Sequence, residues 1–317
     1  MNQIINNEKI ARKKSKIIPR LIIISGVIVF IVLLSILVFN FVIKNSEHKA
    51  SITDLQKHWN AYDYESVYNL SNDILIENPF NNTALTYHGY SAFYLAVSQI
   101  DTALSQSYLD EAINNMRNAL LNAKHSLIPQ LEYMLGKAYF YKNTITSYYY
   151  ADLAVKYLVS ARKHGYKADD IPEYLGLSYA ALGQTMESIS AFTEALLIRE
   201  SDTLLLSIAE QYYKIQQPSA AKQYLFRIIQ NSENDELIIK SRNLLANIYI
   251  DSQEYSDAKS EFELILQKNK NFADAYYGLG VIYEKQGDLV KARSEWRKAL
   301  KLQVNHAGAL AKISDYK

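Results

Sequence analysis

Residues 273–299 read ADAYYGLGVIYEKQGDLVKARSEWRKA, and small and aromatic residues recur in this stretch at the spacing of two packed helices. The recurring positions are Leu279, Gly280, Tyr283, Gly287, Ala292, Trp296 and Ala299. A second copy lies 34 residues earlier, with Leu245, Ala246, Tyr249, Ala258, Phe262 and Ile265. Since no strand-like alternation interrupts this period, the pattern predicts a stack of helix pairs.

Working backwards, we find seven copies that begin near residues 273, 239, 202, 169, 129, 82 and 48. In six of them a small residue of the first helix faces a small residue of the second, because the two backbones must cross closely. These pairs are Gly280 with Ala292, Ala246 with Ala258, Ala209 with Ala221, Gly176 with Ser188, Gly136 with Ala154, and Gly89 with Ala112. The first copy is weaker, with Leu55 and Val67. Residues 307–317 are expected to form one more helix, which caps the stack.

The pattern resembles the tetratricopeptide repeat (TPR) family over residues 48–317. The chain as a whole resembles the membrane-anchored TPR proteins of bacteria. The resemblance implies an all-α fold, a right-handed superhelical solenoid of about seven helix pairs plus a C-terminal capping helix. It implies protein or peptide partners and no enzymatic activity. The lysine, asparagine and arginine clamp of the chaperone-binding members is not reproduced.

In this family the inner face is lined by set positions of each first helix. In the second and third copies these positions are aromatic, with Tyr90, Phe93, Tyr94, Tyr133, Phe140 and Tyr141, and Trp59 lies next to them in the first copy. Tyrosine and tryptophan are preferred binding anchors because they bury a large area with few rotatable bonds. We therefore predict a partner-binding groove here. The alternative is that these side chains pack between helices.

Two copies exceed 34 residues. The second has about 11 extra residues around 97–108, before Ala112, and the third has about six extra in 142–150, before Ala154. Insertions in repeat proteins often serve binding, although a longer hairpin can also be merely tolerated.

The N-terminal region predicts a membrane anchor. Residues 1–20 form a tail with six bases and one acid, and residues 21–43 carry no charge. As a helix these 23 residues extend about 35 Å, enough to span a hydrocarbon core of about 30 Å. The run is too long for a signal peptide. Residues 44–50 form a short tether to the solenoid of residues 51–317. Since basic residues stay cytoplasmic, this solenoid is expected outside the cytoplasm, in the periplasm of a bacterium with two membranes.

Composition argues against other classes of protein. The net charge of +1 implies no general affinity for nucleic acid, and the chain has no cysteine. Its six histidines lack metal-ligand spacing, and no nucleophile or phosphate-binding motif occurs. We expect no catalytic residue, metal, cofactor or small-molecule substrate.

Together these features favour a single-pass scaffold or adaptor that organises proteins of an envelope assembly, of the secretion or periplasmic flagellar motor type. One alternative is a substrate receptor or holdase for exported chains. Another is a cytosol-facing import receptor with the reverse topology.

Overall fold

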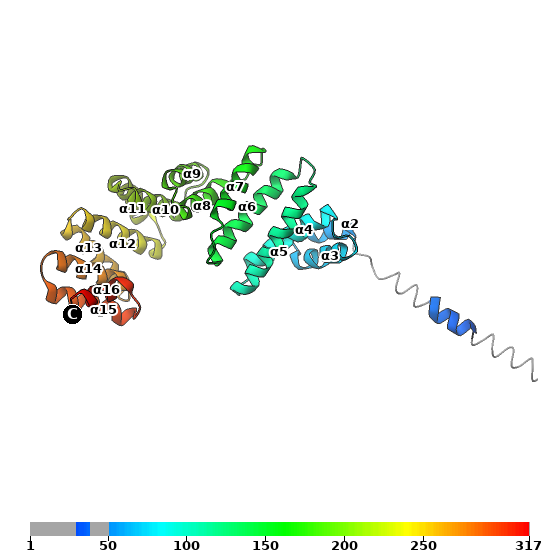
Figure 1. The fold of residues 1–317 in the computed structure, drawn as a ribbon. Helices are drawn as coiled ribbons and strands as arrows, with labels where there is room; N and C mark the ends of the chain where they lie inside the picture. The colour runs from blue at the N-terminus through cyan, green and yellow to red at the C-terminus, as the bar shows by residue number, and fades with distance from the viewer. Residues whose placement is uncertain (1–29, 39–50, 317) are drawn as a thin grey trace, which may run out of the picture. The chain divides into compact units, whose positions relative to one another are not determined.

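The computed structural model describes residues 30–38 and 51–316 (Figure 1). The chain divides into two compact units, Met1–Asp54 and Leu55–Lys317. Residues 30–38 are helical. Within the described ranges, no helix combines the length and the apolar character that crossing a membrane requires. The predicted span 21–43 lies mostly outside these ranges, as do the tail and the tether, so the anchor stays a prediction.

Residues 51–316 fold into consecutive helices joined by short turns, and the described residues contain no strand. The first three pairs are α2 (Ile52–Asn60) with α3 (Tyr64–Glu77), α4 (Asn82–Ser98) with α5 (Thr102–Leu121), and α6 (Ile128–Ile145) with α7 (Ala151–Lys163). The next two are α8 (Ile171–Ala181) with α9 (Thr185–Ile198), and α10 (Asp202–Lys214) with α11 (Pro218–Asn231). The last two are α12 (Asp235–Asp251) with α13 (Tyr255–Lys268), and α14 (Ala273–Lys285) with α15 (Leu289–Leu302). A single helix, α16 (Ala307–Asp315), follows.

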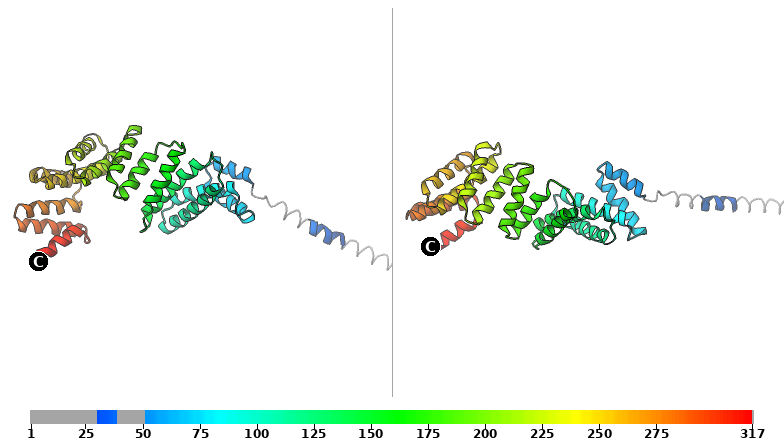
Figure 2. Two further views of the ribbon diagram at one scale, coloured as in Figure 1. Left: turned by 45° about the horizontal axis from the view of Figure 1, so that its top comes forward. Right: turned by 90° about the horizontal axis from the view of Figure 1, so that it is seen from above.

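The seven pairs and the capping helix confirm the predicted repeat, and Figure 2 shows neighbouring pairs packed one against the next. Two boundaries differ by four residues: α2 begins at Ile52, where the first copy was expected near residue 48, and α12 begins at Asp235, where the sixth was expected near residue 239. Asn234 caps that helix by accepting hydrogen bonds from the backbone N–H groups of Glu236 and Leu237. This cap adds a first turn to the helix.

The predicted close crossings are present inside the pairs. A Cβ atom added to Gly280 would lie 2.3 Å from Trp296 Nε1, and one added to Gly176 would lie 2.4 Å from the Phe192 ring. The facing Ala292 is fully buried. A glycine at each of these crossings therefore leaves the space that a large side chain of the second helix fills.

The same large side chains join successive pairs. A Cβ atom added to Gly278 of the seventh pair would lie 2.1 Å from the Phe262 ring of the sixth pair. At the C-terminal end, α16 covers the last pair: the Tyr316 ring stacks on Trp296 at 5.9 Å, and Lys312 Nζ lies 2.7 Å from Glu284 Oε2. The capping helix thus closes the apolar face that an eighth pair would otherwise cover.

The two insertions lengthen helices. α4 continues for nine residues past Gly89, and α6 for nine past Gly136, whereas α14 continues for only five past Gly280. At 1.5 Å per residue the extra turn is about 6 Å long. In the third pair the remaining inserted residues form the loop 146–150 before α7. The hairpins of the second and third pairs are therefore longer than those that follow.

Gly280→Ala tests the crossing. We expect it to lower the free energy of unfolding by about 1–2 kcal/mol, because overlap of the new methyl group with Trp296 outweighs the higher helix propensity of alanine. Urea denaturation followed by circular dichroism measures the change. In the double variant with Trp296→Leu the two losses should be less than additive, because leucine leaves room for the methyl group. Strictly additive losses would contradict this contact.

Candidate functional site

The first helices of the first two pairs bring a group of aromatic rings together. The Trp59 ring of α2 lies 5.4 Å from Tyr87, 5.8 Å from Tyr90 and 6.0 Å from Tyr94 of α4, between ring centroids. Tyr64, at the start of α3, stacks on Tyr94 at 4.4 Å. Aromatic pairs at these separations stabilise each other beyond their area burial, so the rings hold α2 against α4.

The structure separates the seven predicted binding residues into two sets. Tyr90, Phe93 and Tyr133 are only 3%, 2% and 8% exposed, so their rings pack in the core between helices. The half-buried residues are Trp59, Tyr94, Phe140 and Tyr141. Helical spacing shows which face a residue occupies but not how deeply the neighbouring pair covers it. Whether any of the seven binds a partner stays a prediction.

Two of the seven, Trp59 and Tyr90, line a groove of about 560 Å³ between α2, α4, α6 and the α5–α6 loop. Most of the other lining side chains carry amide or hydroxyl groups. The full lining is Gln56, Trp59, Asn60, Asn82, Thr83, Thr86, Tyr87, Tyr90, Asn122, Lys124, Ser126, Leu127 and Gln130. We refer to this site as the amide groove. Lys124 is its one charged lining residue, and the other polar side chains of the lining are neutral donors and acceptors, which suit a polar ligand.

Two buried polar atoms of the amide groove are unpaired. Among the described residues, neither the Tyr90 hydroxyl nor Asn82 Oδ1 has a hydrogen-bond partner. The Asn82 side chain is oriented by its Nδ2, which donates to the backbone oxygen of Asn122 at 3.4 Å. Burial raises the pKa of Tyr90, so its hydroxyl stays a neutral donor. An unpaired donor and an unpaired acceptor in one groove can bind a ligand that offers both complements.

Two of the other predicted residues, Tyr133 and Tyr141, take part in a network with the fourth pair. The Tyr133 hydroxyl donates to Asp170 Oδ2 at 2.7 Å, and Lys137 Nζ lies 3.0 Å from the same oxygen. Burial, and then the hydrogen bond to Asp170, raise the pKa of Tyr133. The Tyr141 and Tyr174 hydroxyls are 3.2 Å apart. These polar groups are already paired, so this region joins α6 to α8 and offers a partner little free hydrogen-bonding capacity.

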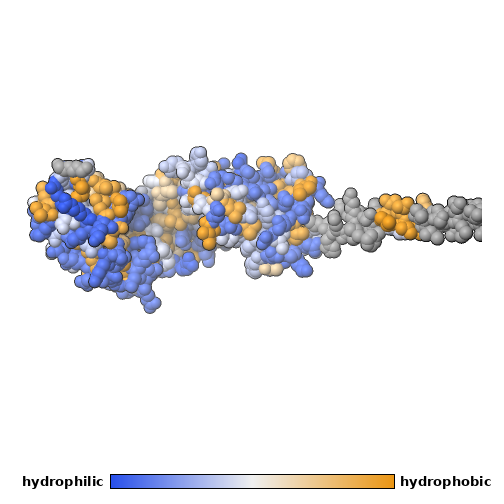
Figure 3. Space-filling view, turned by 90° about the horizontal axis from the view of Figure 1, so that it is seen from below, coloured by the Kyte–Doolittle hydropathy of each residue, from blue (hydrophilic) through white to orange (hydrophobic). Residues whose placement is uncertain are grey.

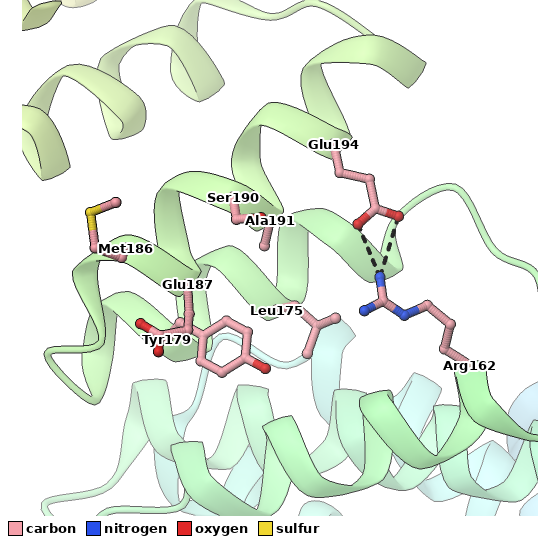
Figure 4. Close-up of a pocket in the computed structure, with 8 residues that line it drawn as sticks. All are labelled: Arg162, Leu175, Tyr179, Met186, Glu187, Ser190, Ala191 and Glu194. Carbon is pink, nitrogen blue, oxygen red and sulfur yellow. Dashed lines mark hydrogen bonds and ion pairs between the residues drawn. The ribbon is translucent and has the colours of Figure 1, made fainter.

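A second pocket, of about 370 Å³, lies between α7, α8 and α9 (Figure 4). Arg162 Nη1 and Glu194 Oε2 form an ion pair of 2.9 Å at its rim, and both side chains are half exposed. Exposed ion pairs contribute little free energy. None of the described polar atoms that line this pocket is both buried and unpaired. The amide groove is therefore the better candidate.

Sequence reasoning missed the amide side chains of the groove. Asn82, Thr86 and Tyr90 are four residues apart, so they share one face of α4, and this spacing could have indicated them. Asn122 and Ser126 come from an inter-repeat loop, where no periodicity reports which way a side chain points. Their place beside α4 is decided by tertiary packing.

No group of three potential metal ligands occurs in the described part of the chain. Four histidines hydrogen-bond to other side chains instead: His58 to Asp63, His88 to Ser71, His164 to Glu132, and His306 to Asp274. These contacts give the four rings structural roles. The expectation of no cofactor and no enzymatic activity stays a prediction.

His88, beside the groove on α4, is only 4% exposed. Its Nδ1 lies 2.9 Å from Ser71 Oγ and its ring stacks on Tyr68 at 4.4 Å. Burial lowers the pKa of His88 below the usual 6.5, although Glu111, with Oε2 at 3.5 Å from Nε2, acts in the opposite direction. The folded protein therefore favours the neutral ring.

Comparison with known proteins supports the repeat architecture. A family model described as the C-terminal ARM domain of tetratricopeptide repeat protein 21 matches residues 161–311. The uncharacterized protein ycf37 of Pyropia yezoensis is 34% identical over 105 residues, which cover 32% of this chain. The chain spans 58% of that relative's length.

One solved structure shows the same fold, and a second aligns less closely. The C-terminal part of a TPR repeat-containing protein from Cytophaga hutchinsonii aligns over 82% of this chain and 98% of its own, with a TM-score of 0.58 and 13% identity. YrrB, described as a TPR protein with an unusual peptide-binding site, aligns over 63% of this chain and 97% of its own, with a TM-score of 0.47 and 22% identity.

The lowered His88 pKa predicts a pH dependence of stability. The unfolded chain takes up a proton near pH 6.5, before the folded chain does, so acid favours unfolding at this site. The stability that His88 contributes is fully present above pH 6.5 and is lost as the pH falls toward the folded pKa. Urea denaturation at pH 7.5 and pH 5.5 measures how much the free energy of unfolding falls with acid. This fall should be smaller for His88→Gln than for the unsubstituted protein. An equal fall would contradict this assignment.

Proposed function

We propose that this chain, a tetratricopeptide-repeat protein, is a scaffold or adaptor that holds an extended, uncharged segment of a partner protein in the amide groove. The observation that carries the proposal is the pair of buried, unpaired atoms there, the Tyr90 hydroxyl and Asn82 Oδ1. Each peptide unit offers one N–H donor and one carbonyl acceptor, which would match the acceptor of Asn82 and the donor of Tyr90, two residues that line the groove. Leaving both unpaired costs free energy that a bound peptide would recover.

The rest of the lining fits the same ligand. Gln56, Asn60 and Gln130 each carry both a donor and an acceptor, and Trp59 and Tyr87 supply aromatic surface. Side-chain amides can pair with the main chain of a peptide whatever its sequence. The aromatic rings would accommodate an apolar side chain of the same segment.

We further propose that residues 21–43 anchor the protein in the cytoplasmic membrane, with residues 1–20 inside the cell and the repeats outside the cytoplasm. The support is the uncharged run of 23 residues and the six bases that precede it. A tether of seven residues, 44–50, would keep the repeats near the membrane. The partner is then a protein of an envelope assembly, of the secretion or periplasmic flagellar motor type.

Tyr90→Phe tests the groove, because it removes the hydroxyl and keeps the ring. We expect the free protein to be equally stable or about 1 kcal/mol more stable, since an unpaired buried hydroxyl is lost. Recovery of crosslinked partners from cells should fall about five- to tenfold, the effect of about 1 kcal/mol of lost hydrogen bonding. Tyr157→Phe, on the outer helix α7, is the matched control and should change neither quantity.

Unchanged recovery with Tyr90→Phe would remove the groove from the binding function. The pattern of crosslinked products tests the scaffold itself. A scaffold should give a few stoichiometric products, whereas a holdase for exported chains would give a broad distribution.

The orientation is tested by a reporter fused after Lys317 that is active only outside the cytoplasm. We expect an active fusion in a bacterial host, because the bases of residues 1–20 remain on the cytoplasmic side. Moving these bases to follow residue 43 should reverse the result. An inactive fusion that is expressed at a normal level would contradict the proposed orientation and favour the cytosol-facing alternative.

A further inference from the structure

The two lengthened hairpins end in exposed apolar side chains. Ile100, in the turn between α4 and α5, is fully exposed, and Val97 and Leu104 beside it are 40% and 43% exposed. In the loop between α6 and α7, Tyr148 and Tyr149 are 73% and 86% exposed. We call these five residues the apolar tips. They fall within the two segments that the sequence identified as insertions.

The apolar tips lie at the same edge of the repeat stack. Near the C-terminal ends of α4 and α6, the Phe93 and Tyr141 rings are 5.7 Å apart. An ion pair between Lys142 of α6 and Asp110 of α5 also joins the two hairpins close to this edge. The amide groove, by contrast, involves the N-terminal half of α4 and the α5–α6 loop, at the opposite end of these helices.

The corresponding turns of the fifth and sixth pairs are short and expose the polar residues Gln216 and Gln253. The turn of the fourth pair is also short and exposes Gln184, but Met186 at the start of α9 is 63% exposed. The seventh pair exposes Val290, but its helix α14 stops five residues past the crossing glycine. The second and third hairpins therefore combine apolar exposure with an extra turn of helix that carries the side chains outward.

The tips carry few charges that would oppose transfer into an apolar medium. Residues 143–150 contain no charged residue. The one acid of the other tip, Asp101, caps α5, and its Oδ1 accepts hydrogen bonds from the backbone N–H groups of Ala103 and Leu104. This carboxylate is thus partly satisfied by the backbone.

We propose that the apolar tips insert into the interfacial layer of a lipid bilayer. Tyrosines concentrate at the depth of lipid head groups, and an exposed isoleucine gains free energy in the acyl boundary. The tips are two separate projections rather than a groove. On one face of the repeats, hydrophobic residues lie in small patches among hydrophilic ones (Figure 3). Isolated projections suit a deformable bilayer better than a protein partner, which would require a matching pocket for each.

The inference rests on the proposed anchor, which supplies the nearby bilayer. The tether of seven residues reaches about 24 Å when fully extended. α2, which starts two residues after the tether, has nine residues and rises about 13 Å toward the turn at its end. The tether is therefore long enough for the stack to rest on the membrane by the edge that carries the tips.

The absence of cysteine from the sequence allows a direct test on the full chain. Ile100→Cys and Tyr148→Cys are each labelled with an environment-sensitive nitrobenzoxadiazole dye. The protein is reconstituted in vesicles of phosphatidylcholine and phosphatidylglycerol. We expect emission at both positions to rise, to shift to the blue, and to be quenched by brominated lipids. Gln286→Cys, in the turn of the seventh pair, is the control and should keep an aqueous spectrum without quenching.

Flotation of the labelled chain with the vesicles separates this inference from the proposed anchor. A chain that does not float would overturn the anchor and, with it, this inference. A chain that floats, while the dyes at residues 100 and 148 stay aqueous and unquenched, would overturn only the insertion of the tips. Blue-shifted emission that appears only after a protein partner is added, without quenching by brominated lipids, would assign the tips to protein binding instead.

Discussion

The close crossing of two helices at a small residue is the contact on which the rest of this structure depends. Gly280 and Gly176 have no side chain where Trp296 and Phe192 pack against them, and an added Cβ would lie within 2.4 Å of those rings. Because the crossing sets the separation of the helices, it sets where the next pair can stack. Repetition of this contact from one pair to the next produces a fold that grows in one direction.

The regularity at the crossings leaves the hairpin ends free to vary. α4 and α6 keep the crossing glycine and extend beyond it at the turn, so an insertion lengthens the hairpin without disturbing the stack. The first three pairs consequently carry two distinct surfaces. The amide groove lies near the start of α4 and the apolar tips near the ends of α4 and α6. A partner segment bound in the amide groove would therefore not compete with contacts made by the apolar tips.

The aromatic inner positions illustrate how far sequence reasoning reaches. It identified Trp59 and Tyr90, which line the groove, because Tyr90 occupies an inner-face position of the repeat family and Trp59 lies next to these positions. It also selected Phe93 and Tyr133, which are buried, because periodicity carries no information about how closely the neighbouring pair approaches. Asn122 was missed, since it reaches the groove from a loop, where its backbone oxygen accepts a hydrogen bond from Asn82 Nδ2.

The sequence by itself determined the number of pairs, their crossing residues, the capping helix and the position of both insertions, because each follows from local spacing along one chain. The tertiary structure decided which aromatic residues are exposed, which polar atoms are left unpaired, and that the inserted residues project as apolar tips. These properties depend on contacts between segments 30 to 40 residues apart, such as Asn82 with Asn122, and residue spacing alone does not record how closely such segments approach.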